Sequence, residues 1–318
     1  LILQRSAIYT SDMRICSLLP SATEIVYALG LGDKLVGVSH ACDYPDDAAT
    51  KPVVSQSVRQ ITHLSSEEID AIVSQARANT NPLYWIDGDL LRELQPDLII
   101  TQELCEVCAV DSGSVFETAA KVLDYQPEIL TIRPSVVADI LQNVRNIASA
   151  AGAAQKGQKL ADSLQARIQT IVDGVADAPS RPRVLCLDWL DPLRNTGQWV
   201  PELVELAGGD EGLAIVGGPS RELTWDEVVE YAPEYLMVMP CAFGPDRVRQ
   251  ETAEKLTCLP GWGDLPAVKL DQVFLFDGRI PTRHGPRVVD VLEGIAEAMH
   301  PQNFKGITNY EVLVNNWA

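Results

Sequence analysis

The chain has 318 residues, 46% of them hydrophobic, which is enough to bury one large core or two lobes of roughly 100–150 residues each. Its 44 acidic and 25 basic side chains give a formal net charge of −19, and a surface of that sign repels the phosphates of nucleic acids and anionic lipids. We therefore expect two lobes and no binding to nucleic acid. We also expect no membrane insertion, because the longest apolar runs are only as long as a strand.

The first residues do not have the pattern of a secretory signal. The segment LILQRSAIYTSDMRICSLL is interrupted by polar and charged residues, among them Arg5 and Asp12, where a signal needs an unbroken apolar core. The sequence starts at Leu1, and Met13 is an alternative start. Seven cysteines, an odd number in a chain with ample core, indicate reduced thiols rather than a framework of disulfides.

The elements of the first half follow the order of a parallel α/β sheet. Residues 15–19 predict a buried strand, and Ser21 followed by Glu24 has the spacing of a capping box at the start of a helix that ends near Gly30. Residues 34–38 predict a second strand, which completes a βαβ unit. Residues 65–78 predict another capped helix, and residues 89–102 predict a helix, a proline break and a strand.

The second half repeats this order after a long helical segment. Residues 134–178 have helical periodicity, and the part from 153 to 175 alone would span about 35 Å. Residues 181–192 predict a strand with a long exit loop, 200–209 a helix ending at glycine, and 225–241 a helix, a proline break and a strand. We therefore predict an N-terminal extension (1–12), an N-terminal α/β lobe (13–133), linking helices (134–178), a C-terminal α/β lobe (179–302) and a tail (303–318). Whether the two lobes arose by duplication stays open.

Thiol and imidazole groups follow several predicted strands. His40 and Cys42 follow the second strand, Cys105 and Cys108 follow the strand at 98–101, and Cys241 follows the strand at 236–239. Ligands bind at the carboxyl ends of parallel strands, so these groups would converge if the two lobes face each other. Three interpretations stay open: small residues lining tight loops, a zinc or iron site, or a redox pair at Cys105 and Cys108.

The other cysteines and His284 are predicted to have no role in ligand binding. Cys16, Cys186 and Cys258 are predicted to lie in the core, and His284 is predicted to be exposed in a loop. The sequence contains no G-x-S-x-G, no dinucleotide-binding glycine pattern and no Walker A loop. We therefore do not expect an enzyme of these classes.

Large aromatic residues lie mostly in predicted loops or helix starts after strands. They either cap the cores or form stacking surfaces for a flat, partly apolar ligand. In a late loop, Asp277, Arg279 and Arg283 either anchor such a ligand or form an internal ion pair in a solvated loop.

Taken in order, several segments of the chain resemble one family. RICSLLPSATEIVYALG, LVGVSHACDYP, LQPDLIIT, the long linking helix and GPRVVDVLEGIAEAM are similar to the substrate-binding proteins of iron-siderophore and vitamin B12 ABC transporters, most closely the cobalamin-binding branch, over residues 14–300. The resemblance implies two Rossmann-like lobes with parallel-rich sheets, joined by one long backbone helix, with a ligand cleft between the lobes. It implies a monomeric, periplasmic, non-enzymatic protein that binds a corrinoid, cobalamin above all, or a related metal chelate, requires no cofactor, and can deliver its ligand to an ABC permease.

The resemblance also assigns residues. By position, the implied ligand contacts are Pro20, Ser21, Tyr44, Trp85, Trp189, Asp277 and Arg283, and the implied permease-docking carboxylates are Asp89 and either Asp226 or Glu227. Two features depart from the family pattern: the thiols and imidazole described above, and the absence of a visible export signal. They leave open a cytoplasmic alternative, a metal-site protein or a metal- or thiol-dependent enzyme that holds zinc or iron through His40, Cys42, Cys105, Cys108 and Cys241.

Overall fold

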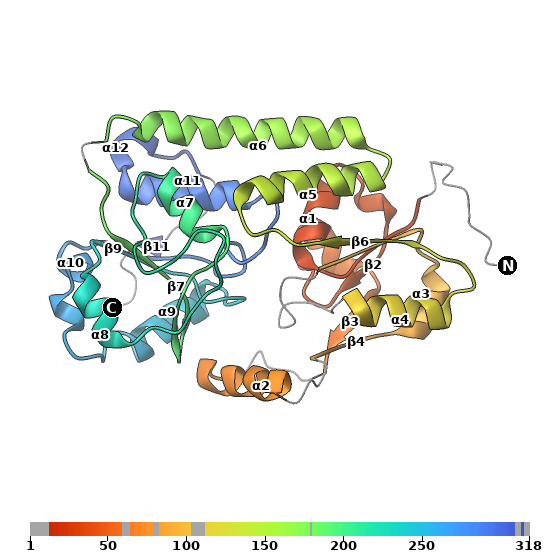
Figure 1. Cartoon of the computed structure of the whole chain (residues 1–318), viewed down its shortest axis with the longest axis horizontal. Helices are drawn as coiled ribbons and strands as arrows, with labels where there is room; N and C mark the ends of the chain where they lie inside the picture. The colour runs from red at the N-terminus through yellow and green to blue at the C-terminus, as the bar shows by residue number, and fades with distance from the viewer. Residues whose placement is uncertain are drawn as a thin grey trace. The chain divides into compact units, whose positions relative to one another are not determined.

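The computed structural model of the chain describes residues 13–58, 64–78, 83–102, 112–178, 180–308 and 313–314. They group into two compact units (Figure 1). Unit 1 comprises Leu1–Pro134 and Asp139–Ser163, and unit 2 comprises Ser135–Ala138 and Leu164–Ala318. The segment 134–178, predicted as a separate linker, is divided between the two units. Among the described helices, none is both long enough and apolar enough to cross a bilayer.

Unit 1 is built on a six-stranded sheet in the order β4-β3-β2-β1-β5-β6. The strands are β1 (Ile15–Ser17), β2 (Leu35–Ser39), β3 (Val53–Ser57), β4 (Tyr84–Ile86), β5 (Leu98–Gln102) and β6 (Glu128–Ile132). Every neighbouring pair is parallel except β3 and β4. The predicted α/β class with a parallel-rich sheet is therefore confirmed, as are the predicted strands near 15–19, 34–38 and 98–102.

The helices of unit 1 begin in two different ways. They are α1 (Pro20–Ala28), α2 (Ser66–Ala78), α3 (Gly88–Leu94), α4 (Ser112–Val122) and α5 (Val137–Ala150), whose first two residues belong to unit 2, with short 3-10 turns at Gly32–Lys34 and Asp46–Thr50. The capping box predicted at Ser21 is wrong, since Leu19 is the N-cap and Pro20 occupies the first turn, where its missing N–H costs nothing. The capping prediction for α2 is confirmed, because the Glu68 carboxylate accepts from the backbone N–H of Ser65 at 2.8 Å and the Ser65 hydroxyl accepts from that of Glu68 at 3.2 Å.

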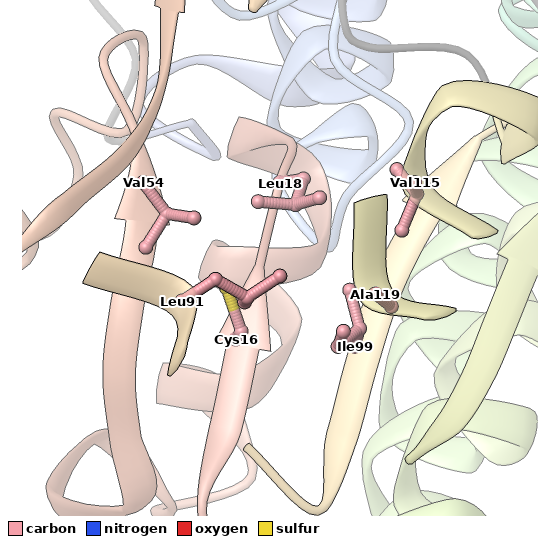
Figure 2. Packing of buried hydrophobic residues seen from close by; sticks show 7 residues of the cluster. All are labelled: Cys16, Leu18, Val54, Leu91, Ile99, Val115 and Ala119. Atoms are coloured by element: carbon pink, nitrogen blue, oxygen red, sulfur yellow. The ribbon is translucent and has the colours of Figure 1, made fainter. Parts of the chain in front are cut away.

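One face of the unit 1 sheet carries a compact apolar cluster. Figure 2 shows side chains from the sheet meeting those of α3 and α4; the cluster consists of Cys16, Leu18, Val54, Leu91, Ile99, Val115 and Ala119. Cys16 is fully buried, as predicted, and burial raises the pKa of its thiol. Close packing also explains Gly37, where an added Cβ would lie 2.6 Å from a Val54 methyl carbon.

Unit 2 is built on a five-stranded sheet in the order β11-β10-β9-β7-β8. The strands are β7 (Val184–Leu190), β8 (Leu193–Asn195), β9 (Tyr235–Val238), β10 (Val273–Leu275) and β11 (Leu313–Val314). The central strands β7, β9 and β10 are parallel, and β8 and β11 add antiparallel edges. The chain after β7 was predicted to leave in a long loop, but it turns back at once to form β8.

The helices of unit 2 include the long helix predicted from periodicity. They are α6 (Ala154–Val175), which begins in unit 1, α7 (Val200–Leu206), α8 (Trp225–Tyr231), α9 (Pro245–Lys255), α10 (Pro266–Lys269), α11 (Val288–Met299) and α12 (Pro301–Phe304), with a 3-10 turn at Trp262–Asp264. Arg167 of α6 donates to both carboxylate oxygens of Glu293 on α11, at 2.8 and 2.6 Å, and to Asp290 at 2.5 Å. This ion-pair network fastens the second half of α6 to unit 2.

Two of the predicted burials are wrong. Cys258 is exposed, because it lies just beyond the last turn of α9, where its thiol faces the Glu254 carbonyl at 3.3 Å. His284 is buried and packs edge-on against Trp199 with ring centroids 5.6 Å apart. Burial lowers the pKa of His284 to about 4, so the ring is neutral at physiological pH.

Candidate ligand-binding surfaces

In unit 1, exposed aromatic side chains lie near the carboxyl ends of β2 and β3. Tyr44 follows β2 and is 46% exposed, and Trp85 of β4 is 45% exposed. Trp85 pairs with Gln56, the next-to-last residue of β3, so it belongs to the same edge of the sheet. Large aromatic surfaces left in water at the ligand-binding edge of a parallel sheet are suited to stacking on an apolar ligand.

His40 lies at this edge, directly after β2. Its backbone N–H donates to the Ser55 carbonyl at 2.9 Å, and its ring Nδ1 lies 3.3 Å from the same oxygen. The imidazole also packs against the Tyr84 ring, with centroids 5.4 Å apart and planes inclined by 31°. Partial desolvation lowers the pKa of His40 below its usual value, which favours the neutral ring.

Cys42, only two residues further on, lies in a different environment. It is 4% exposed, and its sulfur lies 3.0 Å from the Thr23 hydroxyl and 3.3 Å from the Ser39 hydroxyl. The structure therefore places this thiol in a polar pocket of the core, whereas the His40 side chain is at the surface.

The rest of the predicted metal set is not brought together by the described residues. Cys105 and Cys108 lie outside them, and Cys241 belongs to unit 2, just after β9. Within the described ranges, no group of three or more His, Cys, Asp or Glu side chains could hold a metal ion. The zinc or iron site at His40, Cys42, Cys105, Cys108 and Cys241 stays a prediction.

The two residues assigned to the ligand after β1 are less exposed than Tyr44 and Trp85. Pro20 is half-buried and Ser21 is 2% exposed, because both lie in the first turn of α1. A ligand contact from Pro20 or Ser21 stays a prediction, and Tyr44 and Trp85 offer far more accessible surface in this unit.

In unit 2, an aromatic and an arginine side chain surround Phe243, which follows β9. The Trp189 ring lies 5.1 Å from the Phe243 ring, and the Arg247 guanidinium carbon lies 3.6 Å from the centre of that ring. Trp189 donates its indole N–H to the Asp191 carbonyl at 3.0 Å, so its orientation is fixed from within the unit. Arg247, which the sequence did not single out, places its guanidinium on this stack and pairs with the Glu251 carboxylate at 3.3 Å.

The loop after β10 contains an internal ion pair. Asp277 accepts from the Arg279 guanidinium at 2.8 and 2.5 Å, and Arg283 is half-buried in the same loop. The loop passes so close to the preceding strand exit that a Cβ at Gly278 would lie 1.7 Å from the Pro240 carbonyl oxygen. The ligand roles of Trp189, Asp277 and Arg283 stay predictions.

Two carboxyl groups associated with β7 were not found from the sequence. Glu211 is 5% exposed, and its Oε1 accepts from the Cys186 backbone N–H at 2.9 Å and from the Thr196 hydroxyl at 3.3 Å. Burial raises the pKa of Glu211 to about 8. The pKa of Asp188 is also raised well above its usual value, chiefly by desolvation, and the Ser220 hydroxyl donates to it at 3.1 Å. No local pattern identifies Glu211, since it lies in a glycine-rich loop whose residues resemble ordinary surface chain.

The carboxylates assigned to permease docking differ in how far they are already engaged. Asp89 is exposed and forms an ion pair with Arg92 at 2.7 Å, one turn along α3. Glu227 completes a capping box with Thr224 and accepts from Arg221 at 2.9 Å, and these bonds lower its pKa. Asp226 is exposed at the same helix start. Of the two alternatives in unit 2, Asp226 therefore presents its carboxylate to solvent more openly.

Comparison with known proteins identifies the family. The sequence profile of the family described as periplasmic binding protein matches residues 15–280. An uncharacterized ABC transporter substrate-binding lipoprotein of Bacillus subtilis, YvrC, is 24% identical over 92% of this chain and 81% of its own. A vitamin B12-binding protein of Vibrio parahaemolyticus is 23% identical over 89% of this chain and 88% of its own.

Solved structures agree at the level of the fold. The heme-binding protein RhuT of Roseiflexus superposes with a TM-score of 0.68 at 24% identity, covering 92% of this chain and 99% of that one. The vitamin B12-binding protein BtuF of Vibrio cholerae superposes with a TM-score of 0.65 at 23% identity, covering 90% and 96%. The resemblance inferred from the sequence motifs is thus confirmed, and the chain belongs to the periplasmic binding protein family.

Proposed function

We propose that this chain is the substrate-binding protein of an ABC transporter and that its ligand is cobalamin. The observation that carries the proposal is the similarity to vitamin B12-binding proteins over about nine-tenths of both chains. A protein with this role binds and releases its ligand unchanged, so the proposed function needs no catalytic group.

The surface of unit 1 supports a ligand of this kind. Cobalamin presents a broad corrin ring with an apolar periphery and amide side chains, and such a ligand needs flat stacking surfaces together with a few polar groups. Tyr44 and Trp85 supply nearly half-exposed aromatic surfaces at the ligand-binding edge of the sheet. In unit 2, the half-buried Trp189 ring packs on the buried Phe243, and the Arg247 guanidinium on the same ring pairs with the Glu251 carboxylate at 3.3 Å.

The partner and place of action follow from the same proposal. The chain would act outside the cytoplasmic membrane, as a lipoprotein or periplasmic protein, and dock on a permease through Asp89 and Asp226. Both carboxylates are exposed in the first turn of a helix. There Asp226 is open to an arginine of a partner, and Asp89 would exchange its exposed pair with Arg92 for one.

Calorimetry with hydroxocobalamin tests this function. We expect saturable binding, and we expect Tyr44→Ala and Trp85→Ala each to weaken it by about tenfold or more, because a buried aromatic contact is worth on the order of 1–2 kcal/mol or more. Leu270→Ala is the control, since Leu270 is 60% exposed but lies three residues before β10, at the amino end of a strand of unit 2. Absence of binding with corrinoid at roughly tens of micromolar would overturn the proposal. Equal affinity in the wild type and all variants would show that Tyr44 and Trp85 do not contact the ligand.

A further inference from the structure

The hydrogen bond at His40 fixes which ring nitrogen carries the proton. A carbonyl oxygen only accepts, so the contact of 3.3 Å between Nδ1 and the Ser55 carbonyl requires the proton on Nδ1. In the neutral ring Nε2 then carries an unprotonated lone pair. This is the form in which histidine binds a metal ion.

The ring is also held in place by its neighbours. Tyr84 packs against it, and the Ser55 carbonyl that accepts from Nδ1 accepts from the His40 backbone N–H as well. Ser55 is paired in turn with Ile86 across β3 and β4. Metal-binding histidines characteristically donate their second ring N–H to a carbonyl or carboxylate, which orients the ring and strengthens the donor nitrogen. His40 has this arrangement.

The position of His40 matches the proposed ligand edge. It lies at the surface directly after β2, and Tyr44, four residues further on, exposes nearly half of its side chain. Cys42, between them, directs its sulfur toward the Thr23 and Ser39 hydroxyls inside the unit. The segment therefore exposes the His40 imidazole and the Asp43 carboxylate, and of these two the imidazole nitrogen is the donor better suited to cobalt or iron.

A metal ion that arrives inside a tetrapyrrole needs only one such group. The macrocycle supplies the equatorial ligands, and the axial positions remain for a protein donor or water. We propose that His40 is an axial ligand of the cargo: its Nε2 coordinates the metal ion of a bound metal tetrapyrrole and displaces a water molecule from it. The lone pair of Nε2 forms the new bond, water leaves unchanged, and the oxidation state of the metal does not change. This proposal rests on the proposed function but assigns a residue and a bond that the function by itself does not require.

The experiment uses two probes with exchangeable axial water, aquocobinamide and hemin, and the full chain. Aquocobinamide is a corrinoid without a nucleotide base, so a nitrogen bound to its cobalt comes from the protein. After reduction of the bound cobalt to the divalent state, electron paramagnetic resonance should show splitting by a nitrogen nucleus. The hemin arm, read from the absorption bands of the iron porphyrin, shows whether His40 also accepts iron.

His40→Ala should abolish the nitrogen splitting or the shift of the iron porphyrin bands, and added imidazole should restore it by supplying the same donor. Loss of a group that merely supports a metal ligand lowers metal affinity about 10–100-fold. The affinity of His40→Ala for the metal tetrapyrrole should fall by at least that much. His40→Gln, which keeps an amide for hydrogen bonding, should behave like His40→Ala. His300→Gln is the matched control, since His300 belongs to unit 2, where its Nε2 lies 3.0 Å from the Ala207 carbonyl.

The outcomes separate this inference from the function on which it rests. A nitrogen signal that depends on His40, with cobinamide, hemin or both, supports it and identifies the metal. Tight binding with the same spectrum and affinity in wild type and His40→Ala overturns the coordination and leaves the proposed function standing. Failure of every variant, the wild type included, to bind either probe or hydroxocobalamin overturns both.

Discussion

Replacing Glu211 by glutamine should change how the stability of unit 2 depends on pH. Glu211 is buried, and its pKa is raised from 4.5 to about 8 in the folded chain. Between these two values the folded state keeps the proton and the unfolded state releases it, so the free energy of unfolding falls as the pH rises. The contribution of the neutral carboxyl is fully present below pH 4.5, and it is lost progressively up to about pH 8.

The size of the effect follows from the same two values. Each pH unit in this window is worth about 1.4 kcal/mol, so the whole window corresponds to roughly 5 kcal/mol of unfolding free energy. Glutamine is neutral at every pH and keeps an oxygen that can accept from the Cys186 backbone N–H. The free energy of unfolding of Glu211→Gln should therefore rise relative to that of the wild type by about 1 kcal/mol for each pH unit between about pH 5 and 8.

Denaturation in urea at several pH values between about 5 and 8 measures this difference directly. Tryptophan fluorescence reports on the right part of the chain, because Trp189, Trp199, Trp225 and Trp262 all belong to unit 2. Glu222→Gln is the matched control, since the Glu222 side chain is 64% exposed and should leave the pH dependence unchanged. If the difference in the free energy of unfolding between Glu211→Gln and the wild type does not vary with pH, the assignment of a buried, protonated carboxyl is refuted.

Two further predictions concern α6 and the docking carboxylates. Arg167→Met leaves the 7%-exposed Glu293 carboxylate without its cation. We expect the free energy of unfolding in urea to fall by about 2 kcal/mol, less than for a fully buried pair because Arg167 is 37% exposed. Adding Glu293→Gln should recover part of this loss, and unchanged stability in Arg167→Met alone would show that the network contributes little. Asp226→Lys should reduce docking on the permease in a reconstituted transport assay without changing ligand affinity, whereas Glu227→Gln should leave docking intact; the opposite order would mean that Glu227, despite its cap, is the docking carboxylate.

The sequence predicted the elements whose signals are local. The strand at Leu98–Gln102 is a buried apolar run after a proline break, and α6 has unbroken helical periodicity, so both could be identified without tertiary information. The Ser65 cap was identified in the same way. The Ser21 cap failed because Pro20, which has no N–H to be capped, takes the first position of the helix and places the N-cap at Leu19, two residues before Ser21.

Burial and side-chain partners depend on contacts distant in sequence, and here the sequence was less informative. His284 was expected at the surface, yet its loop packs against Trp199, 85 positions earlier in the chain. Glu211 is buried because β7 passes beside it, and the His40 contact with Ser55 arises only when β2 and β3 pair. Hydrophobic periodicity does not encode any of these arrangements, although it does place His40, Tyr44 and Trp189 at or near strand ends.

The absorption spectrum of the full chain, recorded after incubation with hydroxocobalamin and gel filtration, shows whether the chain binds cobalamin. We predict that the corrinoid bands elute with the protein, and that Tyr44→Ala and Trp85→Ala reduce the amount retained. Colourless protein, with all of the corrinoid recovered in the small-molecule fractions, would contradict the claim that this member of the family carries cobalamin.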